Sequence, residues 1–178
     1  QRISGAVAAA VAVRRNISHK HFIEHLMSDL ESKLLMKMTL EDVTLRDVGK
    51  TPKGERRFAT IGGGKFEGPE LKGNVMPGGS DWMSGRGNGS VVMNGRLSLR
   101  TDDGCVIAMR YRGAMDGAPD VLARHSRGEP VAESEYYLRF VTYFETTLYK
   151  YGWLNQMVAV GIGHRETTGP VYHVYEVL

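Results

Sequence analysis

Hydrophobic and polar residues alternate with a period of two along much of this 178-residue chain. Between residues 34 and 40 leucine or methionine occupies every second position, and the segment SVVMNGRLSLRT at residues 90–101 repeats the alternation. A period of two is typical of β-strands that bury one face. The sequence therefore predicts a protein built mainly from strands.

Turn signals divide the chain into about eight such strands. The residues DDG at 102–104 separate residues 90–101 from CVIAMRYRG at 105–113, which predicts a β-hairpin. Three further runs rich in Tyr, Val, Phe and Thr follow in the C-terminal half. The segment APDVLARHSRGEP at 118–130 differs, because Asp120 can cap a helix that the later Gly and Pro end. We expect one short helix there.

Glycines inside the predicted strands favour one all-β architecture over another. An antiparallel sandwich and an antiparallel up-and-down β-barrel both fit about eight strands. Strong curvature needs strand positions without a side chain, and such positions are Gly68, Gly73, Gly95, Gly161 and Gly163. We therefore predict a barrel, whose interior can hold one small ligand.

Composition excludes some functional classes. With 42% hydrophobic residues, the chain fits one globular domain. Its 23 basic and 20 acidic residues are interspersed without a basic stripe, so we expect no nucleic-acid partner. No apolar run is long enough to cross a membrane, and we expect no membrane partner. The single cysteine, Cys105, fits a reducing compartment, so we expect a cytoplasmic protein.

The first 26 residues differ in composition from the rest, since their first acidic residue is Glu24. We interpret residues 1–26 as a leader, a tag remnant or a mis-called upstream segment. A single β-barrel domain is then expected at residues 27–178.

Two predicted strand faces mix arginine with apolar residues. Arg110 lies on one face, and Tyr137, Arg139 and Glu145 share another. Such a face can point to solvent, form an interior ion-pair network, or bind an anionic or carbonyl-bearing ligand through forked hydrogen bonds. On the third interpretation Arg110, Arg139 and Tyr137 are ligand-binding residues, and Glu145 is a candidate catalytic base.

Four other residues are candidates at the ends of predicted strands. Asp81 and Trp82 follow the turn MPGGS, and a side chain there can be aimed into a barrel mouth. Asp81 is a second candidate catalytic residue, and Trp82 and Trp153 are candidate apolar walls. Asn155 is a candidate hydrogen-bond partner for a ligand carbonyl. The alternative roles are turn capping and core packing.

Histidines do not form a recognisable metal motif. His19, His21 and His25 cluster near the N-terminus but lack the His-Glu-x-x-His order of a zinc protease. No P-loop or dinucleotide fingerprint is present. We expect no metal and no cofactor.

Several ordered blocks make the sequence similar to a known family. They are GGGKFEGPELKGNVMPGGSDW, LRTDDGCVIAMRYRG, YYLRF with FET, YGWLN, VGIGHR and the terminal VYEVL. Their order resembles the domain of unknown function 3237, from about Leu30 to Leu178. The resemblance implies a single-domain antiparallel β-barrel without an established activity. It places these residues in recurrent blocks: Asp81, Trp82, Arg110, Arg112, Tyr137, Arg139, Glu145, Trp153 and Asn155.

Three functional hypotheses follow. The first is a barrel that binds a small anionic or carbonyl-bearing apolar molecule in its interior. The second is a cofactor-free isomerase, cyclase or lyase that uses Glu145 or Asp81 as a base. The third is a solid structural barrel that associates with copies of itself, so a homo-oligomer is possible. A base must not be locked to arginine, whereas a binding site tolerates a fully paired carboxylate.

Overall fold

The computed structural model describes residues 30–147 and 149–178. The segment interpreted as a leader, residues 1–26, and its histidines lie outside the described residues. The strands are β1 (Ser32–Glu41), β2 (Thr44–Thr51), β3 (Gly54–Ile61), β4 (Gly63–Glu67), β5 (Lys72–Val75), β6 (Gly79–Gly85), β7 (Val91–Thr101), β8 (Val106–Gly117), β9 (Tyr136–Glu145), β10 (Ala159–Glu166) and β11 (Gly169–Val177). The helices are α2 (Pro119–Ser126) and the 3-10 helices η2 (Glu133–Glu135) and η3 (Tyr149–Gln156).

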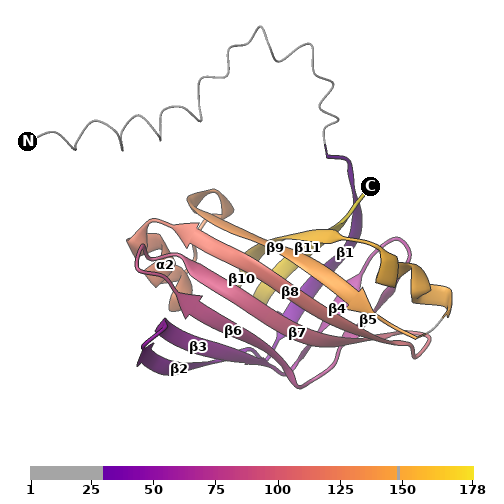
Figure 1. The fold of residues 1–178 in the computed structure, drawn as a ribbon, viewed down its shortest axis with the longest axis horizontal. Coiled ribbons are helices and arrows are strands. Elements are labelled where there is room, and N and C mark those ends of the chain that lie inside the picture. Colours follow the sequence, from indigo (N-terminus) through magenta and orange to yellow (C-terminus); the bar gives the residue numbers. More distant parts are fainter. Residues whose placement is uncertain (1–29, 148) are drawn as a thin grey trace, which may run out of the picture. The chain divides into compact units, whose positions relative to one another are not determined.

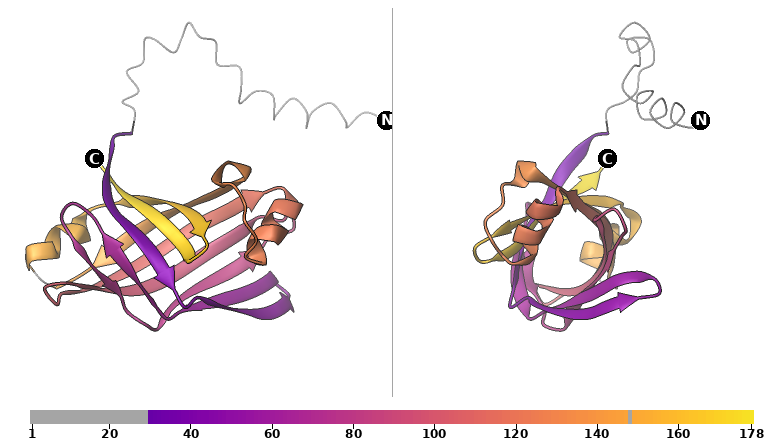
Figure 2. Two further views of the ribbon diagram at one scale, coloured as in Figure 1. Left: turned by 180° about the vertical axis from the view of Figure 1, so that it is seen from behind. Right: turned by 90° about the vertical axis from the view of Figure 1, so that its left-hand side faces the viewer.

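Eight strands close into an antiparallel barrel, in the order β7-β5-β4-β1-β11-β10-β9-β8, with β8 pairing back onto β7. The end-on view of Figure 2 shows this ring. The predicted barrel of about eight strands is therefore confirmed, and the alternative of a sandwich is excluded. Closure pairs every strand of the ring on both sides, which satisfies the backbone hydrogen-bonding groups.

Three further strands extend the barrel wall at one end. On one edge of β7, Leu99–Thr101 pair with β5, whereas Val91–Arg96 pair with β6. Strands β3 and β2 continue from β6, so the β2–β3 hairpin flares away from the ring (Figures 1 and 2). The chain turns from β1 into β2 at Asp42, whose φ of 50° is left-handed and is tolerated by a short Asp side chain.

The predicted short helix is confirmed as α2, which lies at the same end as the β2–β3 hairpin (Figure 1). Pro119 begins its first turn, where the missing N–H is harmless. Asp120 lies inside that first turn, and the capping position is Ala118. Within the helix, the side chains of Val121 and Leu122 are buried.

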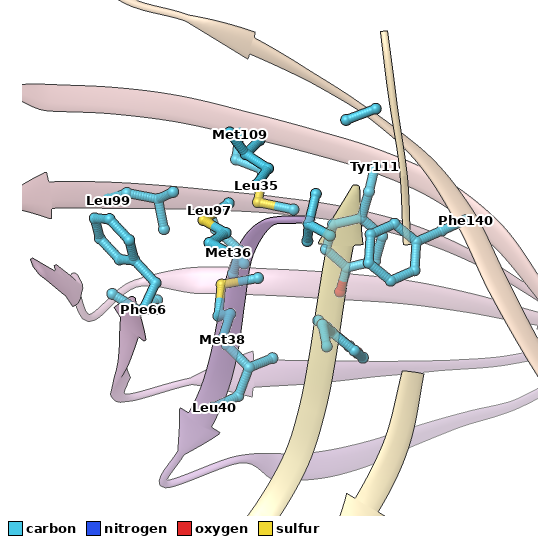
Figure 3. Close-up of a cluster of buried hydrophobic side chains, with 14 of the residues drawn as sticks. Leu35, Met36, Met38, Leu40, Phe66, Leu97, Leu99, Met109, Tyr111 and Phe140 are labelled. Atoms are coloured by element: carbon cyan, nitrogen blue, oxygen red, sulfur yellow. The ribbon is translucent and has the colours of Figure 1, made fainter. Parts of the chain in front are cut away.

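Apolar side chains fill the barrel toward η3. Phe66, Leu99, Ile107 and Leu154 are almost completely buried, and Leu154 comes from η3 itself. Figure 3 shows Phe66 and Leu99 at one side of the cluster and Tyr111 at the other. The η3 end of the interior is therefore packed with side chains.

Strand glycines make room for specific neighbours. A Cβ atom at Gly95 would overlap the ring of Tyr111, and one at Gly161 would overlap the ring of Phe140. At Gly73 a Cβ atom would meet the backbone of the adjacent strand. These glycines thus allow close approach of rings and strands, in keeping with their expected role in a curved sheet.

Candidate functional site

A cavity of about 190 Å³ opens at the α2 end of the barrel. Most of its wall is apolar, including Ile61, Met83, Met93, Met115 and Leu138. Its polar side chains are Asp81, Tyr111, Tyr172, Arg57, Arg165, His125 and Ser126. A mostly apolar wall with a few convergent polar groups is the usual composition of a small-molecule site.

Asp81 is held in this cavity by groups on two other strands, β7 and β8. It belongs to β6 and is only 6% exposed. The hydroxyl of Tyr111 on β8 donates to its Oδ2 at 3.0 Å, and the backbone N–H of Asn94 on β7 donates to its Oδ1 at 3.0 Å. Both carboxylate oxygens thus have a fixed partner.

The surroundings of Asp81 shift its pKa upward. Burial raises the pKa of Asp81, and the hydrogen bonds from Tyr111 and Asn94 oppose that shift only in part. In the described part of the chain, no Lys, Arg or His forms an ion pair with this carboxylate. Asp81 therefore meets the requirement for a base that is not locked to arginine.

Two buried tyrosines stand beside Asp81. Burial raises the pKa of Tyr111 and of Tyr172 well above the usual range, so both hydroxyls stay protonated at neutral pH. The two rings meet edge to face, with centroids 5.9 Å apart, and Phe140 packs against both. This aromatic cluster fixes the direction in which Tyr111 presents its hydroxyl.

A layer of basic side chains lies closer to the mouth. Arg57 pairs in register with Met83, two residues along β3 from the Ala59–Asp81 pair. Arg165 lies two residues beyond Gly163, the register partner of Tyr172. Residues two apart on a strand are separated by about 6.6 Å. The cavity therefore has a deep layer with Asp81 and an outer layer with two arginines.

His125 reaches the outer layer from α2. Its ring packs against Tyr136 with centroids 5.0 Å apart. Burial, with a smaller contribution from the charge of Arg165, lowers the pKa of His125, so the ring is neutral at pH 7. Its Nε2 atom is buried and has no hydrogen-bond partner among the described residues.

The arginines predicted to bind ligand point away from the interior. Arg110 stacks on Tyr143 with its guanidinium 5.5 Å from the ring centroid, and lies 3.9 Å from Glu145. Arg139 stacks in the same way on Tyr137, at 5.2 Å. All five residues lie on the outer face of β8 and β9, because the opposite parity of both strands is buried. The expectation that these side chains enter the barrel is therefore wrong.

The other predicted residues also lie outside the cavity, apart from Asp81. Trp82 is 52% exposed and stacks on Phe58, with ring centroids 4.8 Å apart. Trp153 is partly buried in η3, where it packs against the filled end of the core. Asn155 accepts from the N–H of Thr146 and donates to its carbonyl, which is a capping role. The expected walls and carbonyl partner therefore do not line this cavity.

Sequence reasoning missed several residues that line the cavity. Tyr111 continues the apolar parity of Ile107 and Met109, and Arg57 continues that of Ala59 and Ile61. A polar residue at the end of an otherwise apolar parity is therefore the signal that identifies them. This signal is weaker for the other polar residues of the cavity wall, Arg165, His125 and Tyr172.

Residues 30–147 and 149–178 contain neither a cluster of metal ligands nor a membrane-spanning helix. No group of His, Cys, Asp and Glu side chains there is arranged to hold a metal ion. Within the same residues, no helix has the length and apolar character needed to cross a bilayer.

Comparison with known proteins places the chain among uncharacterised barrels. The family described as "Protein of unknown function (DUF3237)" matches residues 29–177, which confirms the resemblance found in the sequence. A UPF0311 protein of Rhodopseudomonas palustris is 32% identical over 149 residues, covering 84% of this chain and 97% of that protein.

Solved structures have the same fold. A conserved protein of unknown function from Rhodopseudomonas palustris has a TM-score of 0.80 at 32% identity, covering 84% of this chain and 99% of that one. A β-barrel-like protein from Acinetobacter baumannii has a TM-score of 0.72 at 33% identity, covering 84% and 97%. An enzyme from Penicillium herquei has a TM-score of 0.60 at 18% identity, covering 84% and 95%. This last likeness shows the fold alone.

Proposed function

The chain belongs to the protein family of unknown function DUF3237, and we propose that it binds a small, mostly apolar molecule in the cavity beside α2. The observation that carries this proposal is the hydrogen-bonded pair of Asp81 and Tyr111 inside an apolar wall. A buried polar pair orients a ligand by hydrogen bonds, while the surrounding apolar surface supplies affinity. The ligand would therefore direct a hydroxyl group at Asp81 and Tyr111, or a carbonyl group at Asp81 when that carboxyl is protonated.

The size of the cavity limits the ligand. Its volume of about 190 Å³ is below the range of roughly 300–1,000 Å³ typical of sites for drug-sized ligands. An apolar cavity of about 150 Å³ holds benzene. A molecule of one or two rings, or an aliphatic chain of similar volume, fits best.

Binding of 2-naphthol, followed by its fluorescence and by calorimetry, tests this proposal. We expect wild-type protein to bind it, and Tyr111→Phe to weaken binding about ten-fold through the lost hydrogen bond. Tyr143→Phe makes the same chemical change on the exposed outer face and should leave affinity unchanged. Equal affinities of all three proteins would count against the cavity as the binding site.

A second candidate function is proton transfer by Asp81. Its support is that this buried carboxylate lines the cavity and forms no ion pair with a cation of residues 30–147 and 149–178. A raised pKa brings a carboxylate closer to the pH at which a general base works best. The enzyme would then be a cofactor-free isomerase, cyclase or lyase. Glu145, the other candidate base, is exposed beside Arg110 and lies outside the cavity, so we propose no catalytic role for it.

Exchange of the α-protons of 2-tetralone in D2O, followed by proton NMR, tests the second candidate. The wild-type protein should accelerate exchange, and Asp81→Asn should abolish the acceleration while still binding the ketone. A Glu145→Gln control should exchange as fast as wild type. Exchange that survives Asp81→Asn would remove the catalytic role and leave the binding role in place.

The hypothesis of a solid structural barrel has less support, because apolar side chains fill the interior mainly toward η3.

We also propose residues 27–178 as the folding unit, in a cytoplasmic protein. The strands of the barrel lie between Ser32 and Val177, and the thiol of Cys105 is free and buried. Deletion of residues 1–26 should therefore leave the melting temperature and 2-naphthol binding unchanged. A protein that no longer folds would contradict this boundary.

A further inference from the structure

The outer layer of the cavity contains two arginine side chains that form no ion pair with the described residues. Arg57 and Arg165 both line the cavity. Neither forms an ion pair with a carboxylate in the described part of the chain. Guanidinium groups bind carboxylates and phosphates through paired, directional hydrogen bonds. Two such groups at one rim are suited to an anion that comes from outside the protein.

His125 adds an unused hydrogen-bonding atom to the same rim. Its Nε2 atom is buried and lacks a partner among the described residues, while the side chain lines the cavity. Buried polar atoms are nearly always paired, so an orphaned one calls for an explanation. In the tautomer that carries hydrogen on Nε2, a neutral imidazole donates to an anionic oxygen.

We propose that the cavity selects amphipathic anions, with the charged group held at the rim by Arg57 and Arg165 and the apolar body lying inward toward Tyr111. This inference rests on the proposed binding function and names its ligand class. His125 would donate a further hydrogen bond to the anion. The class is small carboxylates, or similar oxyanions, that carry one or two rings.

The charge pattern also fixes the orientation of such a ligand. Asp81 is the carboxylate of the deep layer, and no ion pair within residues 30–147 and 149–178 includes it. An anion placed beside it would suffer either repulsion from the ionised form or the loss of hydration in an apolar wall. At the rim the same anion meets two guanidinium groups. The anionic end therefore faces the mouth, and a hydroxyl at the other end can reach Asp81 and Tyr111.

Three probes that share one ring system separate the parts of this inference: 2-naphthol, 2-naphthoate and 6-hydroxy-2-naphthoate. Wild-type protein should bind 6-hydroxy-2-naphthoate about ten-fold more tightly than 2-naphthol, since hydrogen bonds to charged groups are the stronger ones. Raising the ionic strength should weaken binding of both naphthoates and leave 2-naphthol unaffected. This salt comparison needs no variant and so avoids any folding defect.

Variants then identify the residues. Arg57→Met combined with Arg165→Met should weaken 2-naphthoate binding at least about ten-fold while changing 2-naphthol affinity less than about two-fold. Arg57→Lys keeps the positive charge and should retain part of the affinity for 2-naphthoate. Arg110→Met, on the outer face, is the matched control and should change neither affinity.

The outcomes distinguish this inference from the binding function itself. If 2-naphthol binds but the naphthoates bind no more tightly, or if the double variant loses both probes equally, the anion-selective rim is overturned while the binding function stands. If none of the three probes binds, both proposals fail. Loss of naphthoate affinity in Arg110→Met would place the anion site on the outer wall instead.

Discussion

The hydroxyl of Tyr111 donates to Oδ2 of Asp81 at 3.0 Å. The two residues lie on either side of strand β7, whose intervening residue, Gly95, has no side chain. Gly95 is the register partner of Asp81 on one side and of Tyr111 on the other. Because a Cβ atom at Gly95 would occupy the position of the Tyr111 ring, the glycine is what lets two residues on non-adjacent strands touch.

Substitution of Gly95 tests that relationship. Gly95→Ala should lower the free energy of unfolding by about 1–3 kcal/mol or more, because the tyrosine ring must shift inside a packed barrel. Gly87→Ala is the matched control, since a Cβ atom there meets no neighbour within 4 Å. Urea denaturation measures both. Equal stability of the two variants would mean that the ring can move without loss.

Removal of the Tyr111 hydroxyl should destabilise the fold at neutral pH. Tyr111→Phe leaves Oδ2 of Asp81 buried without its donor, at a cost of about 1–3 kcal/mol in the free energy of unfolding. Tyr143→Phe, on the exposed outer face, should change stability by less than about 0.5 kcal/mol. Thermal and urea denaturation compare the pair. A stable Tyr111→Phe protein would indicate that Asp81 is satisfied in another way.

The buried Asp81 should make stability fall as pH rises. Its pKa is raised by burial above the ordinary value of 3.8, so the folded state binds more protons than the unfolded state in the interval between the two pKa values. The stability associated with this proton is complete below pH 3.8 and is lost as pH rises through the folded pKa. The free energy of unfolding of wild type relative to Asp81→Asn should therefore decrease across that interval. A difference that is independent of pH would show that Asp81 titrates normally.

Asp103 should show the opposite dependence. Hydrogen bonds from Lys150 and Thr101 lower the pKa of Asp103 to about 2 from 3.8. Stability from this ionised carboxylate is present above pH 3.8 and is lost as pH falls toward 2. Asp103→Asn should thus be less stable than wild type at neutral pH and approach it in strong acid. Asp102→Asn, at the neighbouring exposed position, is the control and should show a smaller effect in acid denaturation.

Local sequence signals determined the elements of this protein. The period-two alternation identified the strands, because one face of each strand meets the core and the other meets water. Residues 118–130 identified α2, and the strand glycines identified a curved sheet. Asp81 was singled out because it follows the turn at residues 76–80, and it does lie inside the cavity.

Tertiary structure alone decided which parity of each strand faces inward. On β8 both sets of alternate residues begin with apolar side chains, Val106 with Ala108 and Ile107 with Met109. The alternation therefore predicted a strand but did not show which set faces inward. Which set faces inward depends on the combined burial of eight strands around a closed ring. In this ring Arg110 faces outward and Tyr111 faces inward. The contact between Asp81 and Tyr111, 30 residues apart, likewise exists only because the register of β6, β7 and β8 aligns them on one rung.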